Sequence, residues 1–240
     1  MVDFKNEEYK EEFIEFKDRT LNRLNETINK KIETDYKKSV LLTYWLKDYN
    51  NFLKQELTYR PNYQPALKQG SIVQVNLGFR LGNEQGGLHY AIVLDKNDNK
   101  RKPIITVIPL SSIKECKKLH KTHVNLGSEV YNLIDIKTKQ IIDSANNQIE
   151  ELSKLIKNEE NNLKLKELID KQNENIKYAL DCKNKTKNLK KGSYAICEQI
   201  ITISKMRVYD PITTRDPLYN LIISEGSMEK IKKIIKQNYI

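Results

Sequence analysis

Three short apolar segments follow one another between Ser71 and Leu110, with no helical pattern between them. They lie at residues 72–77, 91–94 and 104–110. Strands that follow one another without long crossover connections pair antiparallel, because a parallel pair needs a connection of a dozen residues or more. We therefore predict an α+β fold built on a strongly bent antiparallel sheet, closed as a small barrel.

The remaining strand candidates come much later in the chain. Segments 122–126 and 194–203 have strand-like patterns, and 219–223 is a further short candidate. A closing helix is expected from Ser227, since Ile231, Ile234 and Ile235 share one face there.

The N-terminal part has a helical pattern. Its apolar residues recur at helical spacing and predict two amphipathic helices, at about 5–33 and 36–58. Pro61 and Pro65 end this pattern, because each removes a backbone donor and disfavours the helical conformation of the preceding residue. The predicted domains are an N-terminal helical region, 1–65, and a barrel domain, 66–240.

A second helical segment interrupts the strands. No proline or glycine occurs from Thr138 to Leu189, and the apolar pattern is broken only by the polar stretch 157–162. A helical hairpin inserted between barrel strands at about 136–191 fits this pattern better than one long helix. We expect it to pack with the N-terminal helices as one helical subdomain. The alternative is an additional arm that binds nucleic acid or a partner.

The charge distribution points to a polyanionic partner. The chain of 240 residues has a formal net charge of +10, yet residues 1–65 carry 12 Lys and Arg against 12 Asp and Glu. The excess therefore lies in the second domain. A basic surface attracts RNA or DNA through counterion release and steering; the alternative is a basic chain that is simply soluble.

Cysteine usage and hydropathy limit the remaining classes. Cys116, Cys182 and Cys197 cannot all pair and show no CxxC spacing, so neither a disulfide framework nor a metal site is expected. The N-terminus is polar, and no run approaches the roughly 18 apolar residues of a membrane span. We expect a soluble cytoplasmic protein with reduced thiols, no cofactor and no membrane contact.

A glycine-rich polar loop, residues 82–87, precedes His89 at the start of the second strand. It concentrates backbone N–H groups, an amide, a carboxylate and an imidazole, which together suit a phosphate site. Three motifs follow it in order: Val107-Ile108-Pro109-Leu110-Ser111-Ser112, Thr122-His123-Val124 and Cys197-Glu198-Gln199-Ile200. This ordered set resembles the MazF/PemK family of toxin endoribonucleases, over about residues 69–127 and 192–237.

The resemblance implies an SH3-like barrel of the CcdB/PemK type. It implies metal-independent, sequence-selective cleavage of single-stranded RNA, mRNA in particular, leaving 2′,3′-cyclic phosphate and 5′-hydroxyl ends. A homodimer and a cognate antitoxin protein are the partners that it implies, as in type II toxin–antitoxin systems.

Such cleavage needs a base, an acid and donors for the charged phosphorane. His89 stands where the family most often has an arginine, and can act as an acid or, when protonated, as a cation. Ser111 matches a Thr or Ser that hydrogen-bonds the scissile phosphate, and Glu198 matches an acidic position proposed as general base. Because Ile196 and Ile200 flank Glu198, we expect a mostly buried strand and a raised pKa of this carboxyl.

Each catalytic candidate also has a structural alternative: a loop-end histidine, a strand-ending serine and a carboxylate that caps the loop 83–85. RNA binding is expected in the loops at about 78–88 and 112–121, because single-stranded RNA is read through splayed bases. The candidate RNA-binding residues are Arg80, Asn83, Glu84, Gln85, Gly86, Gly87, Ser112, Lys117, Lys118, His120, Lys121, Gln199 and Arg207. His123 is interpreted as a residue that packs in the barrel.

Three functions stay open at this point. The leading one is the toxin endoribonuclease. The second is a catalytically weak RNA-binding barrel, for which the missing arginine argues. The third is a CcdB-like toxin directed at DNA gyrase, against which the polar loop with Ser111 and Glu198 argues, since a protein-binding surface would not need that set.

Overall fold

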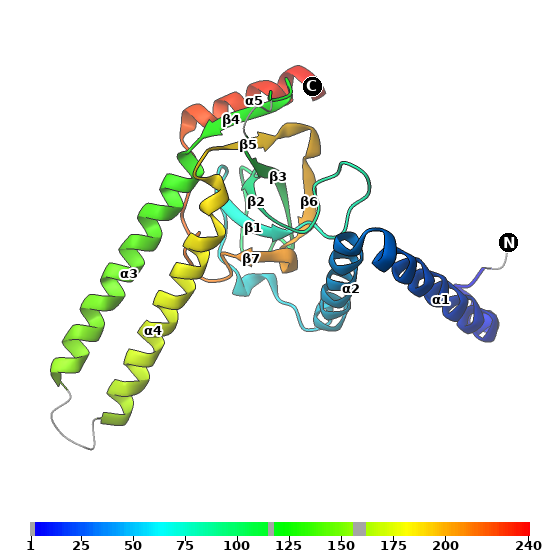
Figure 1. Ribbon diagram of the computed structural model, residues 1–240, viewed down its shortest axis with the longest axis horizontal. Coiled ribbons are helices and arrows are strands. Elements are labelled where there is room, and N and C mark those ends of the chain that lie inside the picture. Colours follow the sequence, from blue (N-terminus) through cyan, green and yellow to red (C-terminus); the bar gives the residue numbers. More distant parts are fainter. Residues whose placement is uncertain (1–2, 115–117, 156–161) are drawn as a thin grey trace. The chain divides into compact units, whose positions relative to one another are not determined.

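The computed structural model describes residues 3–114, 118–155 and 162–240 (Figure 1). Contacts divide the chain into two units, residues 1–58 and 59–240. No helix in the described ranges is both long and apolar enough to cross a membrane.

The first unit consists of two helices. The turn η1 (Glu7–Tyr9) leads into α1 (Lys10–Thr34), and α2 (Tyr36–Glu56) follows. Asp35 joins them, and its carboxylate accepts a hydrogen bond from Lys38 N at 3.2 Å, which caps α2. The two predicted helices are confirmed. Since α1 buries no residue and α2 buries only Ser39, this unit has almost no core of its own.

The described residues of the second unit form seven strands that pair antiparallel. The sheet follows the path β4-β5-β3-β2-β1-β7, with β6 paired to β3. The strands are β1 (Ile72–Asn76), β2 (Leu88–Val93), β3 (Ile104–Ser112), β4 (His123–Gly127), β5 (Ser193–Ile196), β6 (Ile201–Ser204) and β7 (Val208–Asp210). The α+β class is confirmed. The predicted barrel closure is not, because among the described residues the path ends at β4 and β7 without pairing them.

Strand β3 organises this sheet. Its first half pairs with β6, its middle with β2, and its last three residues, Leu110 to Ser112, with β5. Apolar side chains cover it on both faces: Ile108 belongs to one core cluster and Val107 to the other. A strand buried on both faces is held firmly in register, so the hydroxyls at its end have fixed positions.

The C-terminal strands differ from the prediction. The segment 194–203 is not one strand, because β5 pairs with β4 and the end of β3 whereas β6 pairs with the start of β3. The chain changes partners at the 3-10 turn η5 (Cys197–Gln199). Segment 219–223 forms only one isolated bridge, between Ser71 and Ile222.

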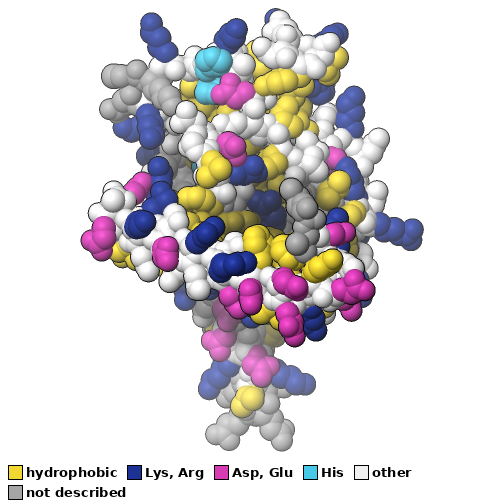
Figure 2. Space-filling model, turned by 90° about the vertical axis from the view of Figure 1, so that its right-hand side faces the viewer, with side chains coloured by type: hydrophobic (Ala, Val, Ile, Leu, Met, Phe, Trp, Pro, Cys, Tyr) yellow, Lys and Arg dark blue, Asp and Glu magenta, His cyan; other side chains and the backbone are white. Residues whose placement is uncertain are grey.

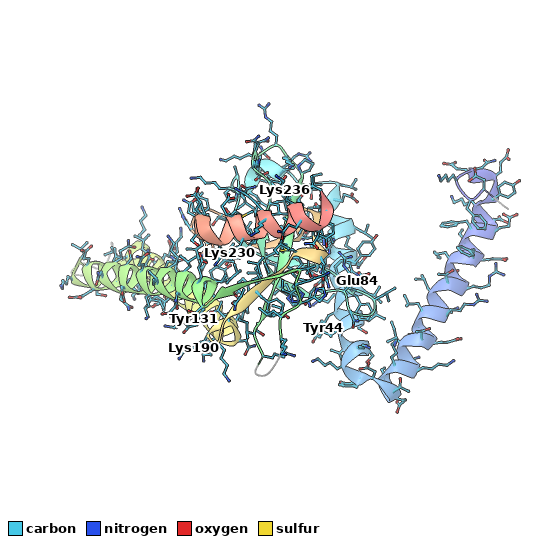
Figure 3. All side chains as sticks on the ribbon, turned by 90° about the horizontal axis from the view of Figure 1, so that it is seen from above. Tyr44, Glu84, Tyr131, Lys190, Lys230 and Lys236 are labelled. Carbon is cyan, nitrogen blue, oxygen red and sulfur yellow. The ribbon has the colours of Figure 1, made fainter. Side chains whose placement is uncertain are left out.

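The inserted helical hairpin is confirmed as two helices, α3 (Glu129–Leu155) and α4 (Asn162–Lys185), that pack side by side (Figure 1). Most of the predicted break between them lies outside the described residues. Tyr131 and Lys190, labelled in Figure 3, mark the base of the hairpin at the sheet. Both helices belong to the same unit as the sheet; one subdomain shared with the N-terminal helices stays a prediction.

The closing helix α5 (Glu225–Tyr239) lies against β4 (Figure 3). Ser224 caps it by accepting a hydrogen bond from Ser227 N at 3.3 Å. The Glu129 carboxylate at the start of α3 accepts from Ser227 Oγ at 2.5 Å, which ties the hairpin to α5. Ile231 on the inner face is fully buried, as the sequence pattern predicts.

Candidate active site

A cleft of about 340 Å³, here named the β2–β3 cleft, brings three predicted site residues together. His89 comes from β2, and Ser111 and Ser112 come from the end of β3. The other polar residues in its lining are Gln74 from β1, Tyr90 from β2, and Lys185 and Asn188 from the base of the hairpin. Residues with imidazole, hydroxyl, amide and ammonium groups therefore line one space.

The His89 ring has a defined orientation. Its Nδ1 lies 3.3 Å from the carbonyl oxygen of Leu110. A carbonyl only accepts, so Nδ1 is the protonated ring nitrogen in this contact. The other nitrogen, Nε2, then accepts a proton in the neutral ring and donates one in the charged ring.

The glycine loop uses several of its N–H groups inside the protein. Gly87 N donates to the Gly78 carbonyl at 2.7 Å, and Gln85 N donates to Gln199 Oε1 at 2.6 Å. Gly86 is required for the close approach, since a Cβ there would lie 2.8 Å from Gly78 O. The N–H groups of Gly87 and Gln85 therefore already have acceptors inside the protein, and a phosphate site at this loop stays a prediction.

A second cleft of about 220 Å³, the Glu198 cleft, is lined by Arg80, Glu84, Gln85, Glu198 and Gln199. Gln199 also donates from Nε2 to the Asn83 carbonyl at 3.1 Å. Both ends of its side-chain amide therefore bind the glycine loop, because Oε1 accepts from Gln85 N. Pro109 lines this cleft while Leu110 lines the β2–β3 cleft. The linings of the two clefts therefore include consecutive residues of β3.

Glu198 does not have the predicted surroundings. It lies on the turn η5 rather than in a buried strand, and its side chain is 37% exposed. Thr122 Oγ1 donates to its carboxylate, and this hydrogen bond, followed by that from His123, holds the pKa of Glu198 below its ordinary value. The expected raised pKa is wrong, because hydrogen bonding to the charged form outweighs the partial burial.

Two histidines flank this carboxylate. His123 Nε2 lies 3.3 Å from Glu198 Oε1, and His120 Nδ1 lies 3.3 Å from Oε2. Figure 2 shows histidine side chains beside an acidic side chain on this surface. Since the hydroxyl proton of Thr122 is used on Glu198, the 2.7 Å contact of His120 Nδ1 with Thr122 Oγ1 makes Nδ1 the donor. We call His120, Thr122, His123 and Glu198 the histidine cluster.

The interpretation of His123 as a packing residue holds only in part. Its ring stacks on Tyr194 with 4.8 Å between centroids, and it begins β4 rather than lying in mid-strand. Its Nδ1 is buried with no hydrogen-bond partner among the described residues. The hydrogen bond to Glu198 was not predicted.

The other predicted RNA-binding residues vary in setting. Lys118 and Lys121 are exposed, whereas Lys117 lies outside the described residues. Arg207 donates from Nε to the Asn76 carbonyl at 2.7 Å, and burial, with a smaller effect of Arg80, lowers its pKa. Arg80 pairs with Glu84 at 3.3 Å. In the described part of the chain, no group of three His, Cys, Asp or Glu side chains could hold a metal ion.

Fold and site together define a mixed helix and antiparallel-sheet domain with a polar cleft of histidine and serine side chains. Residues 68–163 match the family described as PemK-like, MazF-like toxin of type II toxin-antitoxin system. This match over residues 68–163 confirms the resemblance to that family seen in the sequence. No curated protein matches the chain significantly. His89 and Ser111 lie inside the matched range, whereas Glu198 lies beyond it.

Proposed function

We propose that this chain is a toxin endoribonuclease that cuts single-stranded RNA, mRNA in particular, at selected sequences. The observation that carries the proposal is the meeting of His89, Ser111 and Ser112 in the β2–β3 cleft, within the range that matches the toxin family. An imidazole and strand-end hydroxyls in one open cleft can supply proton transfer and hydrogen bonds to a phosphate.

In the proposed reaction, the 2′-hydroxyl attacks the adjacent phosphorus and the bond to the 5′-oxygen breaks. The products are a 2′,3′-cyclic phosphate and a 5′-hydroxyl, and no metal takes part. His89 gives a proton from Nε2 to the leaving oxygen, because Nδ1 is engaged with Leu110. Ser111 donates to the phosphate oxygens, and this bond strengthens as negative charge develops.

We assign the general base to the histidine cluster and not to Glu198 alone. A carboxylate with a lowered pKa is a weak base, but it can fix the orientation and tautomer of an imidazole that accepts a proton. His120 suits this step, because its side chain is 56% exposed and its Nδ1 is engaged, which makes Nε2 the accepting nitrogen.

The proposal includes the neighbouring Glu198 cleft as the place of an adjacent nucleotide. Arg80, Gln85 and Gln199 would contact its base or phosphate, and Lys118 and Lys121 the strand further along. As a type II toxin in the cytoplasm, the chain would act as a homodimer and be held inactive by a cognate antitoxin protein.

A second candidate is an RNA-binding domain that does not cut. Two observations favour it: His89 lacks the permanent charge of an arginine, and the lowered pKa of Glu198 reduces its strength as a base.

The deciding experiment is incubation of the purified chain with a long single-stranded RNA in EDTA, followed by primer-extension mapping of the new ends. Cleavage at recurrent sites, with 5′ ends that a polynucleotide kinase can phosphorylate, is the expected result. The His89→Ala variant serves as control and should lose at least about a hundredfold in rate, the usual scale of acid–base help. Binding without cleavage would select the second candidate, and absence of both would overturn the proposal.

A further inference from the structure

The β2–β3 cleft contains a cation that comes from outside the sheet. Lys185, the last residue of α4, lines the cleft together with His89, Ser111 and Ser112. Among the described residues of this lining, Lys185 is the one with a permanent charge, since a histidine is charged only when protonated. The inserted hairpin therefore contributes directly to the candidate active site.

The end of α4 is anchored firmly to the sheet. Thr186 is fully buried and donates from Oγ1 to the Lys183 carbonyl at 2.8 Å. Cys182 is buried and shares a hydrogen bond with Tyr90 of β2, and Leu189 packs in the core that contains Leu110. The backbone at the end of α4 is therefore held in a defined place relative to the sheet.

The ion pair of Lys185 with Asp181 is weak enough for a phosphate to replace Asp181. Lys185 Nζ lies 2.6 Å from Asp181 Oδ2 one helical turn away, and both side chains are about half exposed, at 50% and 54%. Exposed pairs of this kind contribute little to stability. Lys183 differs, because Asp135 holds it at 2.9 Å across the hairpin. Lys185 is thus the lysine of this turn that can move to a phosphate.

We propose that Lys185 binds the scissile phosphate and neutralises the charge that develops on it. This inference rests on the proposed endoribonuclease function. An ammonium group beside the strand-end hydroxyls supplies a charge-assisted hydrogen bond that does not depend on the protonation of His89. The hairpin then has a role in catalysis in addition to its packing.

The test compares Lys185→Ala with Lys187→Ala in single-turnover cleavage, with the enzyme in saturating excess over the RNA. Lys187 is also exposed and lies two residues further on, but it is not part of the cleft lining. Removing Lys185 should slow cleavage at least about tenfold, whereas removing Lys187 should change the rate less than about twofold. Lys185→Arg should keep the rate within about threefold of the parent, because the charge and a donor remain.

A second comparison separates phosphate binding from a structural role. Lys185→Gln should lose as much rate as Lys185→Ala, because glutamine keeps a donor and much of the side-chain length but removes the charge. The thermal midpoints of all variants should equal that of the parent; if Lys185→Ala is unstable, Lys185→Gln replaces it.

The outcomes distinguish the two proposals. A parent that cuts RNA while Lys185→Ala and Lys187→Ala behave alike would overturn the role of Lys185 and leave the endoribonuclease function standing. A parent that does not cut RNA would overturn the function itself.

Discussion

His123 Nε2 lies 3.3 Å from Glu198 Oε1, although 75 residues of chain separate them. The antiparallel pairing of β4 with β5 produces this contact, since it places His123 opposite Ile196, two residues before Glu198. The same carboxylate also contacts His120 and Thr122. The turn after β5 therefore completes an acid–base group that two distant segments of the sequence supply, residues 120–123 and Glu198.

The Glu198→Gln substitution tests the histidine cluster. Glutamine keeps the size of the side chain but removes the charge that orients the two imidazoles. We expect single-turnover cleavage to fall about a hundredfold, with RNA affinity changed far less. The measurement is the rate at saturating RNA beside the dissociation constant at fixed salt. An equal loss in both would indicate contacts made in the ground state, and would favour the domain that binds without cutting.

The Ser111→Ala substitution tests the strand-end hydroxyl in the same way. If Ser111 donates to the phosphate, the hydrogen bond strengthens in the transition state, so turnover should fall by about tenfold or more while binding stays within about twofold. Thr202→Ala on β6 is a matched control, because its hydroxyl contacts Thr106 and lies outside the lining of both clefts. A Ser111 variant as fast as the parent would remove this residue from the mechanism.

The sequence predicted most of the fold because the period of its apolar residues is clear. Helical spacing identified both helical segments, and strand-like segments identified β1 to β4. The ordered motifs identified His89 and Ser111, which share a cleft in the structure. These patterns extend over short stretches of neighbouring residues, so one sequence is enough to recognise them.

What the sequence did not reveal depends on pairing between distant segments. The run from Tyr194 to Ile203 is mostly apolar, and the polar pair Glu198-Gln199 within it does not by itself reveal the change of pairing partner at η5. A lysine is usually exposed, yet the Lys205 side chain is only 1% exposed. It can be buried because it forms an ion pair with Asp98, which is distant in the sequence. The entry of Lys185 into the cleft likewise depends on how the hairpin joins the sheet.

Asp210 should make stability depend on pH. Burial raises its pKa from 3.8 to about 7, although Leu218 N and the Tyr178 hydroxyl donate to it at 3.1 Å. A carboxyl with a raised pKa stabilises the fold fully below 3.8, and this stabilisation is lost as the pH rises through about 7. Between pH 5 and 8 the parent should therefore lose roughly 1–3 kcal/mol that Asp210→Asn does not lose.

The measurement is urea unfolding at both pH values, followed by circular dichroism. Asp143→Asn is the control, since Asp143 is exposed on α3. If Asp210→Asn shows the same pH dependence as the parent, Asp210 is not the titrating group.

The ion pair of Lys205 with Asp98 should be important for stability. Lys205 Nζ lies 2.6 Å from Oδ1 and 2.8 Å from Oδ2 of Asp98, and it donates to the Asn99 carbonyl at 2.9 Å. Both side chains are almost fully buried. Lys205→Met leaves a buried carboxylate without its partner, which should cost about 3–5 kcal/mol of unfolding free energy. Adding Asp98→Asn removes the uncompensated charge and should recover part of the loss in urea unfolding. A single variant as stable as the parent would contradict this role.

Removal of the N-terminal helices should leave the rest of the chain folded. Both core clusters lie between Leu67 and Ile231, and the ion pair of Asp98 with Lys205 also lies within residues 59–240. A fragment of these residues should therefore stay soluble and unfold cooperatively in urea, with the midpoint that circular dichroism finds for the sheet in the full chain. Trp45, the single tryptophan, lies in the removed unit, so its fluorescence reports that unit separately in the full chain.

Aggregation of the fragment, or binding of a hydrophobic dye, would contradict the prediction and favour a helical subdomain shared between the N-terminal helices and the hairpin. Cleavage of RNA by the fragment should equal that of the full chain, because the linings of both clefts lie within residues 59–240; a more active fragment would instead identify the N-terminal helices as an autoinhibitory segment.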